Sequence, residues 1–109
     1  MDTTDAHIFH LVPREEWDPD LPRYAPDSLE AEGFVHCSTE EQLARVANAV
    51  FPEHRDLLVL EIDPTRVTAE VVWEDLYDLD EDFPHIYGPV EREAIVSVTI
   101  YPPTRSPSH

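Results

Sequence analysis

The chain contains no lysine, and its seven basic residues are all arginine, against 24 acidic residues. The formal net charge at pH 7 is −17. A protein with this balance repels phosphate backbones and anionic lipid headgroups, so we expect neither nucleic acid nor a membrane surface as its partner. A small-molecule ligand, even an anionic one, remains compatible with this charge if a few arginines and backbone N–H groups are focused on it.

Cysteine is almost absent, and long apolar runs are missing. Cys37 is the one cysteine, so no intrachain disulfide can form, which is typical of a reducing compartment. No run approaches the ~20 apolar residues of a membrane span, and residues 1–5 lack the basic and apolar parts of a signal peptide. The sequence therefore predicts a cytoplasmic protein in which Cys37 is a small buried thiol rather than a nucleophile.

The 109 residues are enough for one hydrophobic core and too few for two. Hydrophobic residues make up 41% of the chain, which excludes a disordered protein. We expect a flexible tail at 1–6, a single α+β domain at 7–101 and a second flexible tail at 102–109. The sequence predicts no oligomeric state.

Hydrophobic periodicity predicts the elements of this domain. Strands are expected at 7–12, 34–38, 57–62, 67–73 and 94–101. The nearly continuous apolar run at 57–62 indicates a central strand covered on both faces. Pro13 and Pro26 favour short helices near them, and Gly33 would end the second of these helices. The acidic segment 75–82 lacks the calcium-loop pattern, so it is expected to be a solvated connection.

The stretch 33–41 reads as a strand that runs directly into the main helix. Side-chain alternation places Phe34, His36 and Ser38 on one face of the strand and the small apolar residues between them on the other. Ser38 is the expected N-cap of the helix, with Glu41 as its capping-box partner. The imidazole of His36 would then lie beside a helix N-terminus, where unpaired N–H groups attract anionic ligands.

Three motifs carry a resemblance to a known family. They are Glu32 to Ser38, Leu60 to Pro64 and Phe83 to Pro89. In this order they resemble the signatures of an uncharacterised bacterial family, the domain of unknown function 952, over nearly the whole chain. That family is related to the ADP-ribosyltransferase-like fold, so the resemblance implies a compact α+β domain with a split mixed β-sheet flanked by short helices. It implies no established reaction.

The resemblance to ADP-ribosyltransferases also implies a ligand, NAD or a related nucleotide. His10 matches the histidine that holds the ribose of NAD, and the segment 36–39 resembles the wall of the nucleotide pocket. The place of the catalytic glutamate is occupied by His85 and Tyr87, although Glu74, Glu91 and Glu93 are also near it in the chain. A histidine there can move protons near neutral pH but does not reproduce the role of that glutamate.

We therefore predict a histidine-lined pocket that binds or processes a nucleotide or ADP-ribosyl-type ligand. His36 and His85 are the predicted catalytic residues, and His85 would donate or accept the proton. The predicted ligand-binding residues are His10, Ser38, Tyr87 and Glu74, with Tyr87 stacking on a ring of the ligand.

Alternative interpretations stay open for these residues. The histidines, with a carboxylate such as Glu74, could instead bind a divalent metal ion, although no compact metal-ligand spacing is present and no metal ligand is assigned. His10, His36 and Ser38 could serve only the fold. The protein could also be a non-catalytic acidic module that binds a basic partner. The sequence does not decide whether the protein is an enzyme.

Overall fold

Strands predominate in the computed structural model, which describes residues 6–51, 56–75 and 80–101. The strands are β1 (Ile8–Pro13), β2 (Arg23–Tyr24), β3 (Val35–His36), β4 (Leu57–Ile62), β5 (Val71–Glu74), β6 (Phe83–Ile86), β7 (Val90–Glu91) and β8 (Ile95–Tyr101). The α-helices are α1 (Asp27–Glu32) and α2 (Leu43–Val50), with 3₁₀ turns η2 (Arg14–Glu16), η3 (Pro64–Arg66) and η4 (Arg92–Ala94). The α+β class predicted from the sequence is confirmed.

Some predictions fall on residues outside this description. The predicted tails lie there, apart from Ala6, and so do residues 76–79 of the predicted acidic connection. Within the described residues, neither helix has the length and apolar character needed to cross a bilayer.

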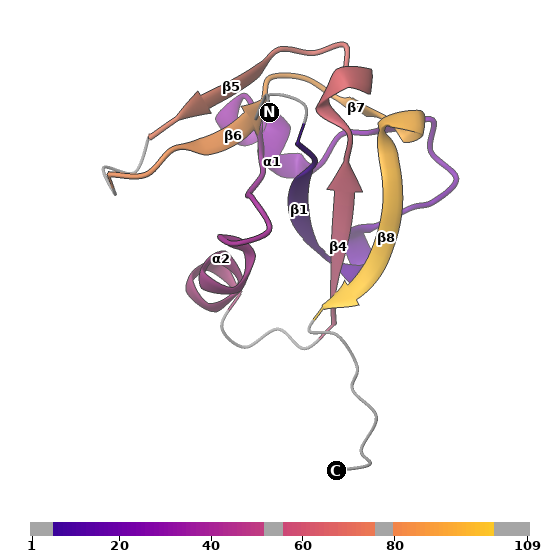
Figure 1. Ribbon diagram of the computed structural model, residues 1–109. Coiled ribbons are helices and arrows are strands. Elements are labelled where there is room, and N and C mark those ends of the chain that lie inside the picture. Colours follow the sequence, from indigo (N-terminus) through magenta and orange to yellow (C-terminus); the bar gives the residue numbers. More distant parts are fainter. Residues whose placement is uncertain (1–5, 52–55, 76–79, 102–109) are drawn as a thin grey trace.

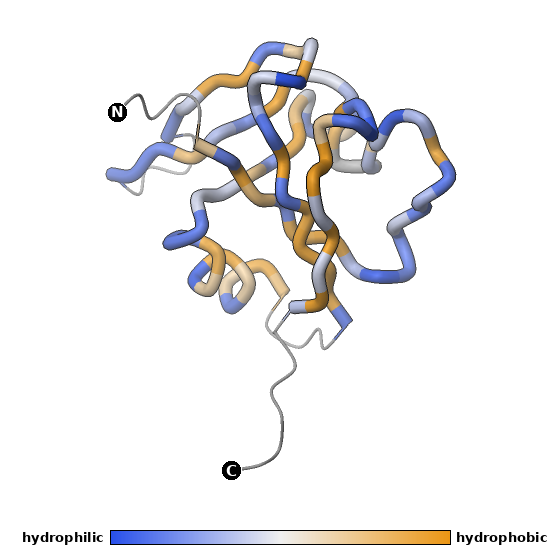
Figure 2. The backbone as a smooth tube through the Cα atoms, turned by 45° about the vertical axis from the view of Figure 1, so that its right-hand side comes forward, coloured by the Kyte–Doolittle hydropathy of each residue, from blue (hydrophilic) through white to orange (hydrophobic). Residues whose placement is uncertain are grey.

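The largest sheet has the order β1-β4-β8, and both pairings in it are antiparallel. Figure 1 shows its three strands side by side, with α2 beside the end of β1. The strand β4 is central and almost entirely buried, as its continuous apolar run predicts. In Figure 2 the strands that cross the middle of the molecule are largely hydrophobic, while hydrophilic residues concentrate in the connecting loops.

A second sheet has the order β3-β6-β5, and β2 pairs with β7. A single bridge between Phe9 and Ser38 connects β1 to the segment after β3, and main-chain hydrogen bonds of 2.8 and 2.7 Å join these two residues. Every strand pairing among the described residues is antiparallel, so the prediction of a mixed sheet is wrong. The two three-stranded sheets are nevertheless distinct, and the bridge holds His36 close to β1.

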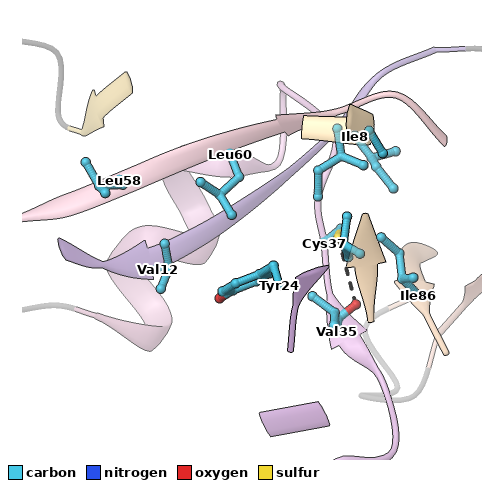
Figure 3. Close-up of a cluster of buried hydrophobic side chains, with 11 residues drawn as sticks. Ile8, Val12, Tyr24, Val35, Cys37, Leu58, Leu60 and Ile86 are labelled. Carbon is cyan, nitrogen blue, oxygen red and sulfur yellow. Dashed lines mark hydrogen bonds between the residues drawn. The ribbon is translucent and has the colours of Figure 1, made fainter. Parts of the chain in front are cut away.

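Two apolar clusters form the core. The first cluster lies between the sheets and includes Val35, Cys37 and Ile86, which Figure 3 shows together. Cys37 is fully buried, as predicted, and burial strongly raises the pKa of its thiol. The second cluster packs α2 against Leu11 and the outer face of β4. The alternation of β1 explains this division, because it sends Ile8 and Val12 into the first cluster and Leu11 into the second.

The main helix begins later than the sequence predicts. No side chain caps α2, and Ser38 lies five residues before its first residue, Leu43. The capping box that does form joins Thr39 to Gln42: the Gln42 N–H donates to Thr39 Oγ1 (3.2 Å), and the Thr39 N–H donates to Gln42 Oε1 (2.9 Å). The main-chain N–H and C=O of Ser38 are both bonded to Phe9, in the bridge to β1. The predicted N-cap at Ser38 is therefore wrong, and the helix begins seven residues after His36 instead of directly after the strand.

Candidate functional site

A cavity of about 540 Å³ lies among α2, β1 and the ends of β3 and β6. Its apolar wall consists of Leu11, Val46, Ala49, Val50, Phe51 and Phe83. Its polar wall consists of His10, Glu32, His36, Ser38 and Arg45. The volume is within the usual range of small-molecule pockets, about 300–1,000 Å³, and so is the mixture of a large apolar wall with a few polar groups.

The register of the second sheet assembles a hydrogen-bonded chain behind this cavity. His36 of β3 pairs with His85 of β6, and His85 in turn pairs with Val72 of β5. Glu74, two residues along β5 from Val72, therefore lies on the same face as Val72 and reaches His85 diagonally. His36 Nδ1 lies 3.1 Å from His85 Nε2, and His85 Nδ1 lies 2.9 Å from Glu74 Oε2.

The bonding partners in this chain determine where the protons lie. Hydrogen bonds from Tyr87 and from His85 hold the pKa of Glu74 below its usual range, so the carboxylate is ionised at pH 7 and acts only as an acceptor. Nδ1 of His85 must then carry a hydrogen. In the neutral form of that ring Nε2 is an acceptor, and His36 then donates from Nδ1 and has its lone pair on Nε2.

The imidazole of His36 is neutral at pH 7. Burial, followed by the neighbouring His85 and His10 rings, lowers the pKa of His36 to about 4. The ring is only partly buried and lines the cavity, whereas His85 is completely buried and stacked on Phe34, with ring centroids 4.2 Å apart. His36 is thus the member of the Glu74–His85–His36 chain that a ligand can reach.

His10 connects β1 to the rest of this site. Its Nδ1 donates to the main-chain oxygen of His36 (2.7 Å), and its Nε2 accepts from the Tyr24 hydroxyl (2.7 Å). Burial lowers the pKa of His10 to about 4, although the bond to the His36 carbonyl acts in the opposite direction. Because both ring nitrogens have protein partners, His10 holds the backbone of His36 in place.

Ser38 also reaches the cavity, two residues beyond His36 on the same side of the chain. Ser38 is almost completely buried, with a relative exposure of 2%. Within the described part of the chain its hydroxyl has no hydrogen-bond partner, although its main-chain groups are bonded to Phe9. The hydroxyl therefore has both its donor and its acceptor capacity available to a molecule in the cavity.

The six residues predicted from the sequence fall into two groups. His10, Ser38 and His36 line the cavity, whereas Glu74, His85 and Tyr87 do not. Tyr87 is 41% exposed, and its hydroxyl donates to Glu74. Its ring packs against Phe34, with centroids 5.5 Å apart, instead of facing the cavity. Tyr87 therefore supports the Glu74 carboxylate in this structure.

Arg45 and its partners are the main features that the sequence did not indicate. The guanidinium of Arg45 lines the cavity and forms two hydrogen bonds with the Glu81 carboxylate, of 2.9 and 2.6 Å. Gln42 donates to the same carboxylate (2.8 Å) and to the Asp82 carbonyl (2.9 Å). The bonds from Arg45 and Gln42 lower the pKa of Glu81 to about 2. Arg45 is the one arginine of the main helix, so the sequence could have suggested it as a site residue. Its partner Glu81 lies 36 residues away in the chain, and the sequence does not indicate that the two meet.

No metal centre is evident at this site. Among the residues that the structure describes, no group of three or more histidine, cysteine, aspartate or glutamate side chains is arranged to hold a metal ion. The internal hydrogen bonds of the chain Glu74–His85–His36 occupy both ring nitrogens of His85 and Nδ1 of His36. The geometry thus favours proton chemistry or ligand binding over the alternative of a divalent metal site.

Comparisons with known proteins establish the family and the fold. The family described as "Protein of unknown function (DUF952)" matches residues 11–98. A crystal structure of protein CC0527 from Caulobacter crescentus superposes with a TM-score of 0.76 at 24% identity, covering 87% of this chain and 85% of that chain. The solution NMR structure of CC0527 gives a TM-score of 0.64 at 23% identity, covering 85% and 82%. Among functionally curated proteins no relative matches. The kinship with the ADP-ribosyltransferase-like fold stays a prediction.

Proposed function

Because this chain belongs to the DUF952 family, for which no reaction is given, we propose its function from the site: the protein binds a small molecule in the cavity, and His36 accepts a hydrogen bond or a proton from it. The observation that carries this proposal is the hydrogen-bonded chain Glu74–His85–His36, which ends on the cavity wall. An ionised carboxylate at its far end orients both rings and selects the tautomer with a lone pair on Nε2 of His36.

The same hydrogen-bonded chain of side chains can accommodate a proton taken from the ligand. When Nε2 of His36 takes a proton from the ligand, its Nδ1 proton can move to Nε2 of His85. The positive charge then lies on His85, in direct contact with the Glu74 carboxylate at 2.9 Å. A charge on the cavity wall is thereby replaced by a partly buried ion pair between His85 and Glu74. His36 is the proposed catalytic residue, and His85 and Glu74 are positioning residues that also receive the charge.

The partners and the location belong to this proposal as well. The ligand is a small molecule, and nucleic acid is disfavoured by the net charge of −17. The single buried thiol of Cys37 is compatible with the reducing cytoplasm.

The decisive experiment has two parts. Long-range ¹H–¹⁵N NMR spectra at pH 7 should show His36 protonated on Nδ1 only. The protein is then titrated with NAD, ADP-ribose and a set of neutral aromatic fragments while the His36 Nε2 signal is followed. We expect at least one compound to shift that signal. If His36 has the opposite tautomer, or if every compound leaves its resonance unchanged, the proposed function is wrong.

Two variants test whether ligand binding needs the Nε2 lone pair of His36 and not only the folded protein. His36→Asn keeps an N–H donor where Nδ1 lies, so the bond to His85 can persist, but it removes the Nε2 lone pair. We expect it to abolish binding of the compound found above while the protein stays folded. His7→Gln is the matched control, because His7 bonds to Glu61 (2.6 Å) and does not line the cavity. Equal loss of binding in both variants would contradict the assignment.

A further inference from the structure

We propose that Glu81 determines the specificity of the cavity: by neutralising Arg45 it makes the cavity take uncharged, largely apolar molecules and exclude carboxylates and phosphates. This inference rests on the proposed function and gives the class of its ligand. Three features of the structure support it, namely the ion pair of Arg45, the contacts that hold Glu81 in place and the apolar character of the remaining wall.

Arg45 has its charge compensated inside the protein. Among the described residues that line the cavity, Arg45 is the one arginine and Glu32 is the one carboxylate. The two terminal nitrogens of Arg45 each donate to one oxygen of the Glu81 carboxylate, at 2.9 and 2.6 Å. This paired geometry uses the donors that an anionic ligand would need. A carboxylate or phosphate would therefore have to displace Glu81 and also approach Glu32.

The Glu81 carboxylate is held in place independently of Arg45. An exposed ion pair by itself contributes little, and the side chain of Arg45 is 65% exposed. Gln42, however, is almost completely buried and donates to the same carboxylate (2.8 Å), while the main-chain N–H of Glu81 donates to the Asp75 carboxylate (3.3 Å). Gln42 is itself fixed by its capping box with Thr39. Little side-chain freedom of Glu81 is therefore lost when the pair with Arg45 forms.

The remaining wall favours the body of a ligand and not a charge. Val46, Ala49 and Val50 follow Arg45 on α2, and Leu11 adds to them from β1. A ligand that covers these side chains removes apolar surface from water, which favours binding by about 25 cal/mol per Å². An anion of the same size would gain this term, but it would lose its hydration without an uncompensated cation in return. The cavity is therefore expected to prefer the uncharged molecule.

Two probes with the same aromatic body test this inference: p-cresol, which is uncharged at pH 7, and p-toluate, which is negative. The folded full-length protein is titrated with each probe, and the main-chain amide resonances of Val46, Ala49 and Val50 report binding in the cavity. We expect the wild type to bind p-cresol at least about tenfold more tightly than p-toluate.

The variant Glu81→Gln removes the counter-charge of Arg45. Arg45 and Ala49 lie one turn apart on the same side of α2, so a released guanidinium can reach a ligand that covers Ala49. We expect this variant to bind p-toluate about tenfold more tightly than the wild type does, and to change p-cresol binding less than about twofold.

Two control variants separate the release of Arg45 from other effects. Glu70→Gln removes the same charge at an exposed position that does not line the cavity, so it should leave both affinities unchanged. The double variant Arg45→Gln/Glu81→Gln has no cation to release, so it should bind p-toluate as weakly as the wild type. A gain for p-toluate that persists in the double variant would overturn the assignment of specificity to this pair.

The remaining outcomes distinguish the ligand class from the proposed function. The inference is overturned if the wild type binds p-toluate as tightly as p-cresol, or if Glu81→Gln strengthens both probes equally or neither. It is overturned as well if no probe shifts the α2 resonances in any of the proteins, whereas the wider titration that follows His36 decides about the function. The wild-type comparison can overturn the inference even if Glu81→Gln does not fold, which its amide spectrum shows.

Discussion

The neutral buried histidines make the stability of the protein depend on pH in a way that can be measured one residue at a time. His10 has a pKa of about 4 in the folded protein, against an ordinary value of 6.5. The unfolded chain therefore binds a proton at His10 more readily than the folded protein does. This contribution to stability is fully present above pH 6.5 and is lost as the pH falls toward 4.

The size of the effect follows from the two pKa values. Between pH 7 and pH 5, a group shifted from 6.5 to about 4 loses about 2 kcal/mol of its contribution to the free energy of unfolding. His36 has the same shifted value and adds a similar but smaller loss, because it is only partly buried. The pKa values of Glu81 and Glu74 are lowered as well, so their contributions are lost at still lower pH, while a smaller net negative charge acts in the opposite direction.

A difference between two proteins isolates the histidine from these other charges. Urea unfolding of the wild type and of His10→Gln is measured at pH 7, 6 and 5. Glutamine does not titrate but can still donate to the His36 carbonyl and accept from Tyr24. We expect the wild type to lose about 2 kcal/mol more than the variant between pH 7 and pH 5. Parallel pH curves for the two proteins would show that His10 is not neutralised by burial and would refute the reasoning.

Three further predictions concern the elements around the cavity. Thr39→Ala should lower the free energy of unfolding by about 1 kcal/mol, measured with urea, because it breaks the capping box; a larger effect of Ser38→Ala would restore Ser38 as the cap. Gly33→Ala should cost about 1 kcal/mol, because Gly33 has a φ of +89° and an added Cβ would meet nothing within 4 Å, so only the backbone is strained; no loss in thermal unfolding would contradict this. Arg45→Gln should raise the pKa of Glu81 from about 2 toward its ordinary value, followed by carboxyl ¹³C NMR, whereas an unchanged pKa would exclude Arg45 as its main cause.

Local alternation predicted the orientation of the site residues well. Val35 and Cys37 enter the core between the sheets, while His36 and Ser38 face the cavity, as the two-residue period of a strand requires. Membership of the family could also be predicted, because Glu32 to Ser38 and the two later motifs are contiguous in sequence. Features that depend on neighbouring residues along the chain were therefore accessible without coordinates.

How deeply each residue is buried could not be predicted from the sequence in the same way. His85 was predicted to meet the ligand because it stands in the place of the catalytic glutamate of ADP-ribosyltransferases, but its segment forms β6 and the ring is completely buried. What places it behind His36 is the pairing of β3 with β6, which joins residues 49 positions apart. Arg45 was missed for the same reason, since its partner Glu81 lies across the fold. Contacts between distant parts of the chain decide both cases, through strand register for His85 and through the position of α2 beside Glu81 for Arg45, and one sequence does not show them.

The arrangement of the three histidines links the stability of the fold to the chemistry of the site. Burial keeps His10 neutral, and a neutral His10 can both donate to the His36 carbonyl and accept from Tyr24. Protonation of His10 would reverse the bond to Tyr24, whose hydroxyl would then accept, and would place a charge in the buried contact between β1 and β3, so this anchor would be weakened. The position of His36 would be disturbed at the same pH at which its own lone pair is lost. Ligand binding through His36 should therefore fail in the pH range in which the fold loses stability, so both properties should be measured on the same samples.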